Sequence, residues 1–501
     1  MRHTRRTLAA AALALALAAA PADAGELILV GGGRAERVND PALPARAELD
    51  LPMPGAVASA AAARTDRARS PRIAAASSRR GRRAVLRALR RSDEERARVW
   101  RRSYIRSLRE LRRLRGARDT QLRYVVGSVE ALALSRRLSA SRMPAAFLQL
   151  ERNRQYWRRY PFPASRDQVS FRGSQIVFTY FPGEGLQLHP LTTFKKANAL
   201  HGFCEREEPG CDRAALEDLL DEMTGLAVRR SRRFIAWEYM FHFGGGSPPW
   251  MSGMAQATAL QAYARAARLL DKPEYVQTAR RGLGAFETRP PTGVRTTGPG
   301  GGVHYLQYSF SPRLYIFNAF LQSLIGLHDF GKLTGDKRAR ELFREAEPEA
   351  RAEVPLSDVG DWSRYSYAGA ESTRDYHELL REFLQSMCSR RLGRLYCDYA
   401  RRYRGYQVDP PELELLGPAT ATADEPVAIR FSLSKLSAVE LKIYRGERLV
   451  HSALASFRLG THAFTWTPAV PGTVRVELAA KELRTGLGKK DRAAGQIEID
   501  P

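Results

Sequence analysis

The hydrophobic positions of this chain fall into two regimes, one helical and one strand-like. Between about residues 190 and 406, apolar residues recur at spacings of three and four. One such stripe consists of Met254, Ala257, Leu260, Ala264, Ala267 and Leu270. This spacing gives an α-helix one apolar face. The run 314–327 is apolar on nearly every face, so it predicts an inner, fully buried helix. Further helices are expected at 212–230, 274–287, 335–352, 372–388 and 390–404.

Loops rich in Gly and Pro, at 244–250 and 289–302, separate these helices. Many antiparallel helices joined by irregular loops predict an incomplete (α/α) toroid or barrel over residues 191–409. We expect the functional site on the loops at its open end.

Strand patterns flank the helical region on both sides. In residues 160–190, the segments QVSF and QIVFTYF surround a turn at Arg172-Gly173-Ser174, which predicts a β-hairpin region. After Pro410-Pro411, apolar and polar residues alternate in several short runs separated by turns. This pattern predicts an immunoglobulin-like β-sandwich over residues 412–499.

The N-terminal third has a different composition. Residues 93–159 carry helical spacing among many arginines, which predicts amphipathic helices. Residues 25–92 are rich in Ala, Arg, Pro and Ser and poor in large apolar residues, so disorder is expected there. Residues 1–24 combine early arginines, an apolar run and a small-residue cleavage site, the pattern of a signal peptide. The sequence therefore predicts a secreted or cell-surface protein without a transmembrane segment.

The charge of the chain points to anionic partners. The net charge is +26, and residues 51–150 hold 25 arginines, no lysine and seven acidic residues. One interpretation is simply a solvated, arginine-rich surface. The other is a surface that binds an acidic polysaccharide, a cell-wall polymer or lipid headgroups. Nucleic acid is not favoured, because no recognition motif accompanies the charge and the leader predicts export.

The four cysteines form two close pairs, Cys204 with Cys211 and Cys388 with Cys397. Three connectivities are formally open, and two local disulfides are the simplest of them in an exported chain. The spacings do not match a zinc site.

Three tyrosines stand out among the residues able to perform chemistry. The sequence contains no P-loop, GxSxG, HExxH or EF-hand pattern. Tyr308, Tyr365 and Tyr376 lie in HYLQYSFSP, DWSRYSY and STRDYHE, each beside a predicted helix. A single tyrosine in such a place is most often a packing residue. A cluster of phenols, with a pKa of roughly 10, could instead move protons at a weakly acidic C–H bond.

Several segments resemble the C-terminal catalytic domain of D-glucuronyl C5-epimerases. They are YFPGEGLQLHPLTTFKKANAL (180–200), WMSGMAQATAL (250–260), YLQYSFSP with NAFLQSLIGLHDF (305–330) and RDYHELL (374–380). The resemblance covers roughly residues 165–406. It implies conversion of D-glucuronate to L-iduronate within an acidic polysaccharide, without a cofactor, and by a homodimer.

The resemblance also implies roles for individual residues. Tyr308 and Tyr376 would carry protons on opposite faces of the sugar, assisted by Tyr365. The sequence departs from the animal enzymes of this family at two places that bear on the substrate. Gln307 stands where they have a glutamate, and Ser366-Tyr367-Ala368 stands where they have an acidic residue and a nearby arginine. The substrate-binding residues expected here are Trp250, Gln256, His189, Arg364, Arg374 and His377, with Arg364 or Arg374 standing in for that arginine.

Two other functions stay open on the sequence. A uronate polysaccharide lyase starts with the same proton removal and then expels the 4-O-linked sugar. A non-catalytic surface protein would use the same basic and aromatic residues only to bind anionic glycans.

Overall fold

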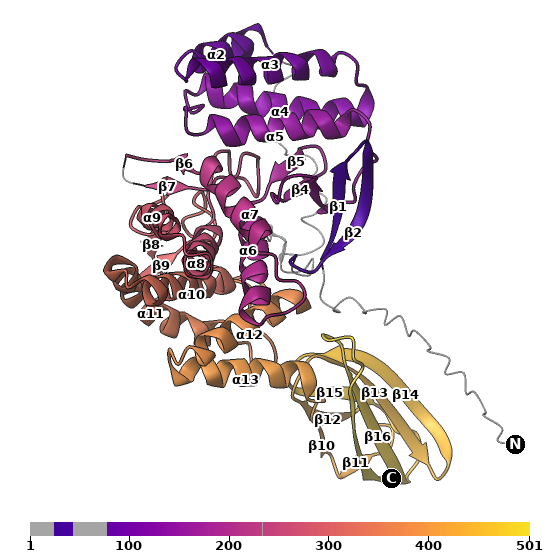
Figure 1. Cartoon of the computed structure of the whole chain (residues 1–501). Helices are drawn as coiled ribbons and strands as arrows, with labels where there is room; N and C mark the ends of the chain where they lie inside the picture. The colour runs from indigo at the N-terminus through magenta and orange to yellow at the C-terminus, as the bar shows by residue number, and fades with distance from the viewer. Residues whose placement is uncertain (1–24, 44–77, 233) are drawn as a thin grey trace, which may run out of the picture.

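The molecule has three parts: an N-terminal helical layer, a central region of sheet and helices, and a C-terminal β-sandwich (Figure 1). The structure is a computed structural model that describes residues 25–43, 78–232 and 234–501. The predicted signal peptide, 1–24, lies outside the described residues.

The helical layer contains α2 (Arg79–Leu89), α3 (Glu94–Leu111), α4 (Gly116–Leu134) and α5 (Met143–Trp157). Two of its helices begin at capping side chains that accept a backbone N–H. Ser78 accepts from Gly81, and Asp93 accepts from Arg96. The helices expected at 93–159 are therefore present as α3, α4 and α5.

The expectation that residues 25–92 are disordered is wrong for two stretches. β1 (Gly25–Gly31) and β2 (Arg34–Asp40) form an antiparallel hairpin, and α2 follows later. β1 also pairs in parallel with β3 (Gln168–Phe171), far along the chain. A composition average hides such short elements, because their stability comes from partners distant in sequence. Residues 44–77 lie outside the described part of the chain.

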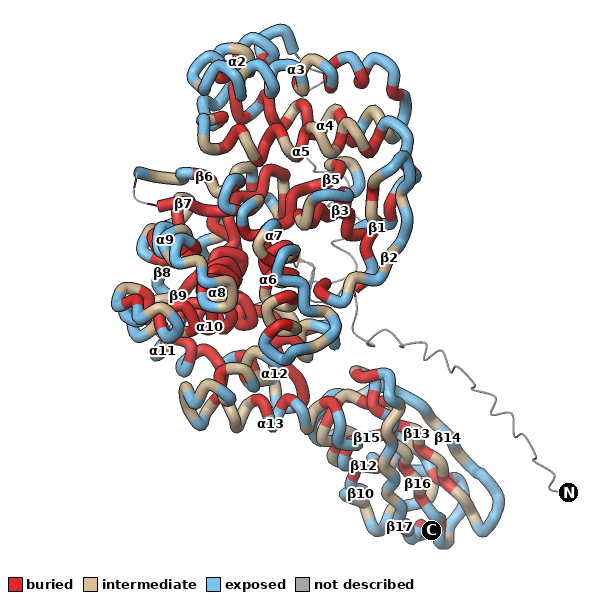
Figure 2. Tube along the Cα trace, viewed as in Figure 1, coloured by how far each residue is buried: buried red, intermediate tan, exposed pale blue. Residues whose placement is uncertain are grey.

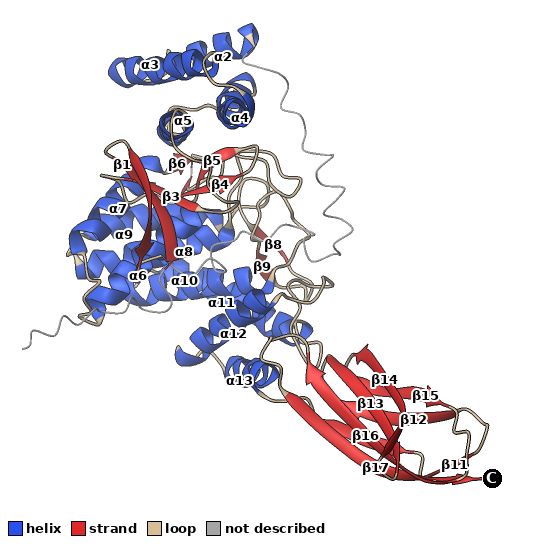
Figure 3. Ribbon diagram, turned by 90° about the vertical axis from the view of Figure 1, so that its right-hand side faces the viewer, coloured by secondary structure: helices blue, strands red, loops and turns tan. Residues whose placement is uncertain are grey.

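A five-stranded sheet joins the helical layer to the main helical domain (Figure 3). Its order is β2-β1-β3-β4-β5, where β4 is Phe178–Phe181 and β5 is Gly185–Leu188. The predicted hairpin is present as the antiparallel pair β3–β4. β4 and β5 turn tightly at Gly183 and Gly185, both with positive φ.

The main domain is helical, with α10 at its centre. Its helices are α6 (Pro190–Glu205), α7 (Arg213–Leu226), α8 (Gly253–Leu269), α9 (Pro273–Gly282), α10 (Phe317–Thr334), α11 (Lys337–Leu356), α12 (Arg374–Ser389) and α13 (Arg394–Val408). α10 contacts α8, α11 and α12, and residues 317–327 are all buried (Figure 2). The prediction of an inner helix is confirmed, while closure into a toroid stays a prediction.

Close approach of α10 to α8 requires a glycine. A Cβ placed on Gly326 would lie 2.3 Å from the carbonyl oxygen of Ala257. Any larger residue would force the two central helices apart.

Short elements and two disulfides complete this domain. The hairpins are β6 (Val228–Arg229) with β7 (Ile235–Ala236) and β8 (Arg295–Thr297) with β9 (Val303–Tyr305). Disulfides join Cys204 to Cys211 and Cys388 to Cys397, so the predicted local pairing is confirmed.

The C-terminal domain is a sandwich of two sheets. One sheet contains β10 (Leu413–Gly417), β12 (Val427–Leu433) and β15 (Gly460–Trp466). The other contains β11 (Thr420–Thr422), β17 (Lys490–Asp500), β16 (Gly472–Glu482), β13 (Ser437–Arg445) and β14 (Arg448–Phe457). Alternate residues of the strands, such as Ile429, Phe431 and Val476, form a core of their own. The two-sheet arrangement is confirmed, and the immunoglobulin-like type stays a prediction.

None of the helices in the described ranges combines the length and the apolar composition needed to cross a membrane.

A buried carboxylate ties the central helices together. Asp329 of α10 accepts two hydrogen bonds of 2.7 Å from Arg390 at the end of α12, and one of 2.7 Å from Gln261 of α8. Arg265 lies 3.3 Å away. Burial alone would raise the pKa of Asp329, but the hydrogen bonds from Arg390 hold that pKa well below its usual range.

We expect Asp329→Asn to lower the free energy of unfolding by about 3–5 kcal/mol, since it leaves the buried arginines without their counter-charge. Urea unfolding at neutral pH measures this loss. Because the pKa of Asp329 is depressed, its contribution is present above the unfolded pKa of about 4 and disappears on further acidification. The exposed Asp398→Asn, which breaks pairs of 3.6 and 3.8 Å, is the matched control. Equal losses for both variants would contradict this account.

Candidate active site

The structure brings the three predicted tyrosines into one cluster. Tyr308 follows β9, Tyr365 lies on the loop between α11 and α12, and Tyr376 lies in the first turn of α12. All three pack in the same group of aromatic side chains. The ring centroids of Tyr365 and Tyr376 are 5.1 Å apart. Tyr308 and Tyr365 are 1% and 5% exposed, whereas Tyr376 is only partly buried. Tyr376 is therefore the most exposed of the three tyrosines.

Burial and mutual interaction control the acidity of these phenols. Burial raises the pKa of Tyr308 and of Tyr365 well above 10, and Tyr376 raises both further. Arg166 and Tyr365 act in the opposite direction on Tyr308, whereas Tyr308 raises the pKa of Tyr365. The Tyr365 hydroxyl has no partner in good hydrogen-bond geometry, so the effect of one phenol on the other is a short-range electrostatic one. Of the two buried phenols, Tyr308 is the one whose raised pKa a nearby cation partly offsets.

Arg166, which the sequence did not single out, supplies a cation at this cluster. It lies just before β3, with its guanidinium 4.4 Å from the ring centre of Phe181 and 5.7 Å from that of Phe243. None of the ion pairs among the described residues involves Arg166. Its charge lowers the pKa of Tyr308 and of Glu184. An unpaired guanidinium next to phenols is suited to bind a carboxylate ligand.

Glu184 is a second residue that the sequence analysis missed. It lies in the turn between β4 and β5, and its Oε2 atom is buried without a hydrogen-bond partner. Burial raises the pKa of Glu184 to about 8, against the opposing effects of Arg166 and Tyr124. The sequence does contain a signal that could have identified this residue. Glu184 is the acid of the FPGEG turn, which belongs to the first segment that resembles the epimerases. A carboxyl that titrates near neutral pH is typical of functional sites.

Trp250 and Gln256 have structural partners. Trp250 stacks on Tyr239, with 4.2 Å between ring centroids, and its Nε1 donates to the Phe241 carbonyl at 2.8 Å. It meets Tyr308 edge-on at 5.7 Å, so it forms a wall of the cluster rather than an open platform. Gln256 bonds both the N–H and the carbonyl of Trp237, at 3.1 and 2.9 Å.

The two predicted histidines are buried and neutral. His189 caps α6, where its Nδ1 accepts from the Thr192 N–H at 3.2 Å, and its Nε2 is buried without a partner. Burial, followed by the charge of Arg166, lowers the pKa of His189 to about 3. His377 uses both ring nitrogens, on Ser363 Oγ at 2.8 Å and on the Tyr403 carbonyl at 3.0 Å. Burial lowers the pKa of His377 to about 4, so it serves to connect the loop of Tyr365 to α12 and α13.

The two arginines expected to bind the substrate are held elsewhere. Arg364 donates to the Gly369 carbonyl at 2.9 Å, within its own loop. Arg374 donates to the Thr485 carbonyl of the sandwich at 2.8 Å and pairs with Glu378 at 3.2 Å. Of these three arginines, Arg166 is the one that lies against aromatic rings of the tyrosine cluster.

A basic cleft leads away from the cluster. It has a volume of about 770 Å³, and Ser309 and Phe310 form the part of its lining next to Tyr308. Arg289, Arg295 and Arg313 line it as well. Phe310 stacks on Tyr308 at 5.3 Å, so a ligand in the cleft would lie against the aromatic ring that covers this phenol. Among the described residues, no group of three or more His, Cys, Asp or Glu side chains is placed to hold a metal ion.

Fold and site thus define a mainly helical domain with a buried tyrosine cluster and an arginine beside it. Residues 230–405 match the family model described as the D-glucuronyl C5-epimerase C-terminus. This stretch of the chain is thus similar to the C-terminal domain of D-glucuronyl C5-epimerases.

Individual relatives cover only parts of the chain. An uncharacterized protein of Methanocaldococcus jannaschii is 24% identical over 190 residues, which are 37% of this chain and 62% of that protein. The D-glucuronyl C5-epimerase of Caenorhabditis elegans is 29% identical over 130 residues, 24% of this chain and 21% of that enzyme. The chain thus spans less than two thirds of either relative's length. Among solved structures, cellobiose 2-epimerase from Spirochaeta thermophila has a TM-score of 0.32 at 14% identity, covering 59% of this chain and 73% of its own.

We expect the carboxyl of Glu184 to titrate near pH 8, which carbon-13 NMR of glutamate-labelled protein can measure. Arg166→Gln should move this titration to higher pH, because the positive charge that favours the carboxylate is gone. Glu222→Gln is the control. It removes a carboxyl that bonds Ser174 and Gln175, so one other glutamate signal should disappear while the titration of Glu184 stays unchanged. A Glu184 that titrates at the ordinary value of about 4.3 would contradict the buried environment described here.

Proposed function

We propose that the protein is a uronate C5-epimerase that converts D-glucuronate to L-iduronate residues in an acidic polysaccharide. The convergence of Tyr308, Tyr365 and Tyr376 beside the unpaired Arg166 carries this proposal. Inversion at C5 needs a proton carrier on each face of the ring and a cation at the sugar carboxylate. The match of residues 230–405 to the D-glucuronyl C5-epimerase family model supports the same reaction class.

In this proposal, Arg166 binds the uronate carboxylate. Removal of the C5 proton places negative charge on that carboxylate, and a guanidinium already in position stabilises it. The guanidinium lies beside two aromatic rings, 4.4 Å from the ring centre of Phe181 and 5.7 Å from that of Phe243, and is only partly exposed. Below pH 8 a protonated Glu184 does not compete with the substrate for Arg166, and above that pH its carboxylate does.

Tyr308 is the base in the forward direction, since Arg166 and Tyr365 favour its phenolate. The Tyr308 phenolate takes the proton from C5, and the Tyr376 hydroxyl gives a proton to the opposite face. Each turnover thus leaves Tyr308 protonated and Tyr376 ionised. Proton exchange with solvent resets both phenols before the next turnover, and Tyr365, whose ring centroid lies 5.1 Å from that of Tyr376, orients that side chain.

The proposal places the protein outside the cytoplasm, as a secreted or cell-surface protein and a homodimer. Two disulfides support the location, because such bonds persist in oxidising compartments. The homodimer rests on the resemblance alone.

An acidic polysaccharide also suits the surface charge. A cavity of about 310 Å³ between α5 and the β1–β2 hairpin is lined by Arg152, Arg154, Arg158, Arg159 and Arg172. Arg154 pairs with Glu151 and Arg172 with Glu36, whereas Arg158 and Arg159 are exposed and form no ion pair with a described residue. The Nε atom of Arg152 is buried without a partner. This cavity is a second place where carboxylates of a polyuronide can bind.

We expect Tyr308→Phe and Tyr376→Phe each to slow epimerisation by about 10²–10⁴-fold, because each removes one proton carrier. The assay follows deuterium entering C5 when glucuronate-containing polymers are incubated in heavy water. Tyr305→Phe is the control: this buried tyrosine is near in sequence but bonds the Leu342 carbonyl at 2.8 Å, away from the cluster. Full turnover in both active-site variants would remove them as proton carriers.

The same assay separates the two alternatives. A lyase shortens the polymer and forms an unsaturated uronate that absorbs in the ultraviolet. A glycan-binding protein causes no exchange with any polymer. Either result would overturn the epimerase proposal.

We expect the pair Arg158→Ala and Arg159→Ala to weaken binding of a glucuronate polymer by about 5- to 30-fold at low salt, as two exposed ion pairs of ~1 kcal/mol or less are lost. The loss should fade as salt screens the charges. Calorimetric titration at two ionic strengths measures both effects. Arg394→Ala with Arg401→Ala removes two exposed arginines from α13 and is the matched control. A loss that is equal in both pairs, or independent of salt, would exclude a specific electrostatic site.

A further inference from the structure

The loop that carries Tyr365 lies between the tyrosine cluster and the C-terminal sandwich. We call residues 358–373 the tyrosine loop. Its two arms pair with each other: the Tyr365 N–H donates to the Ala370 carbonyl at 3.1 Å, and the Ser372 N–H donates to the Ser363 carbonyl at 2.8 Å. On the inner side, the Tyr365 carbonyl accepts from the N–H of Phe317, at the start of α10. The loop therefore sets the position of Tyr365 relative to the central helix.

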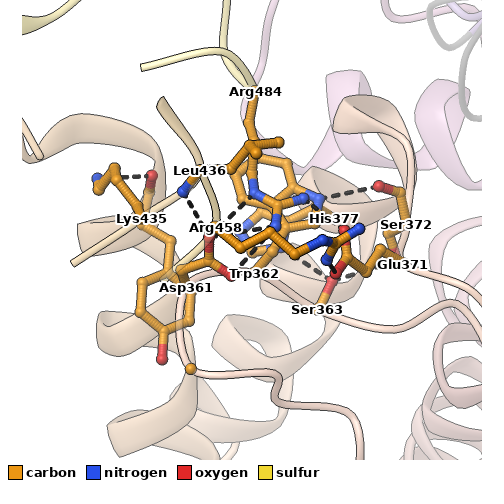
Figure 4. Close-up of polar contacts among 12 residues, drawn as sticks. Asp361, Trp362, Ser363, Glu371, Ser372, His377, Lys435, Leu436, Arg458 and Arg484 are labelled. Atoms are coloured by element: carbon orange, nitrogen blue, oxygen red, sulfur yellow. Dashed lines mark hydrogen bonds and ion pairs between the residues drawn. The ribbon is translucent and has the colours of Figure 1, made fainter. Parts of the chain in front are cut away.

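The outer side of the tyrosine loop is bound by an arginine of the sandwich (Figure 4). Arg484, in the turn between β16 and β17, lies 3.1 Å from both carboxylate oxygens of Asp361 and 2.8 Å from Glu371. Asp361 and Glu371 belong to opposite arms of the loop. A single guanidinium thus bridges the two arms, in the two-sided geometry that lysine cannot reproduce.

Other sandwich groups strengthen this contact. Arg458 donates to Glu371 at 2.5 Å, and the Leu436 N–H donates to Asp361 at 2.9 Å. Burial would raise the pKa of Glu371, but its hydrogen bonds with Arg484 and then Arg458 lower it below its usual value. Asp361 and Glu371 thus rely on the sandwich for their counter-charge, whereas Asp358, the third carboxylate of the loop, pairs with Arg402 of α13.

The contact continues from Arg484 to the helix that carries Tyr376. The Arg484 guanidinium lies 5.5 Å from the ring centre of Trp362, and Trp362 stacks on His377 with 3.7 Å between centroids. His377 is the neighbour of Tyr376 in the first turn of α12. One stack of side chains therefore connects the sandwich with both loop and helix (Figure 4).

Contacts within the sandwich itself hold the turn of Arg484 in place. The Glu482 carboxylate accepts from the backbone N–H groups of Arg484, Thr485 and Gly488, at 3.0, 3.0 and 3.1 Å. The side chain of Arg484 is only 10% exposed. Because the turn is fixed and the guanidinium is buried, Arg484 restricts the motion of the two carboxylates that it binds, Asp361 and Glu371.

We infer that the C-terminal sandwich is a working part of the active site, in which Arg484 is a positioning residue for Tyr365 and Tyr376. This inference rests on the proposed epimerase function. Arg484 acts from outside the site: it neutralises Asp361 and Glu371, whose charges would otherwise repel each other and open the loop. Displacement of Tyr365 by about 1 Å is enough to impair proton transfer.

The test compares Arg484→Ala, Arg484→Lys and the control Arg475→Ala in the full-length protein. Arg475 lies on β16 and pairs with Glu477 on the exposed face of the sandwich. For Arg484→Ala we expect faster amide hydrogen exchange in residues 358–373 and a kcat about 10- to 100-fold lower, with KM unchanged. Arg484→Lys should lie between this variant and the wild type, and Arg475→Ala should match the wild type. Circular dichroism confirms that each variant is folded.

Two results would overturn the inference. One is unchanged hydrogen exchange of the tyrosine loop in folded Arg484→Ala, because the sandwich then does not hold the loop. The other is faster exchange with wild-type kcat, because holding the loop then does not matter to the reaction. If the wild type itself epimerises no polyuronide, the proposed function fails, and with it the positioning role, whereas hydrogen exchange still decides whether the sandwich holds the loop.

Discussion

Removal of phenol hydroxyls from water is the constraint on which this site depends. Tyr308 and Tyr365 are buried among aromatic rings, which makes ionisation of either one costly. A phenolate can form there only if a nearby positive charge compensates it. Arg166 is a positive charge near the cluster that lowers the pKa of Tyr308, and it lies beside the rings of Phe181 and Phe243. In the proposed mechanism, burial suppresses ionisation of these phenols and Arg166 favours the phenolate of Tyr308.

The scaffold places each part of this device on a different segment. Tyr308 precedes α10, the innermost helix, whereas Arg166 precedes β3 and Glu184 lies in the turn after β4. The sheet that holds β3 and β4 is completed by β1, from the beginning of the described chain. The sandwich holds the tyrosine loop from the opposite side through Arg484. Domains that look separate in sequence thus converge on one cluster.

The sequence predicted most elements whose signal is local. Helical spacing located α8, α10 and the later helices, alternation located most strands of the sandwich, and short separations gave both disulfides. It failed where stability comes from distant partners: β1 is explained by its pairing with β3, and α2 by its packing against α4. The three tyrosines were found through resemblance, but Arg166 and Glu184 become visible only when the fold brings strand ends to the cluster. For the same reason Arg364 and Arg374 looked suitable by nearness in sequence, although their side chains bond the loop and the sandwich.

The central claim is that two different phenols serve the two faces of one sugar carbon. The most direct measurement follows the early reaction of the wild-type protein with a glucuronate polymer in heavy water, comparing C5 of the new L-iduronate with C5 of the remaining D-glucuronate by NMR. The account predicts deuterium in the L-iduronate while the remaining D-glucuronate still carries hydrogen, because the donor on the second face exchanges with solvent. L-Iduronate that retains the original hydrogen would contradict it.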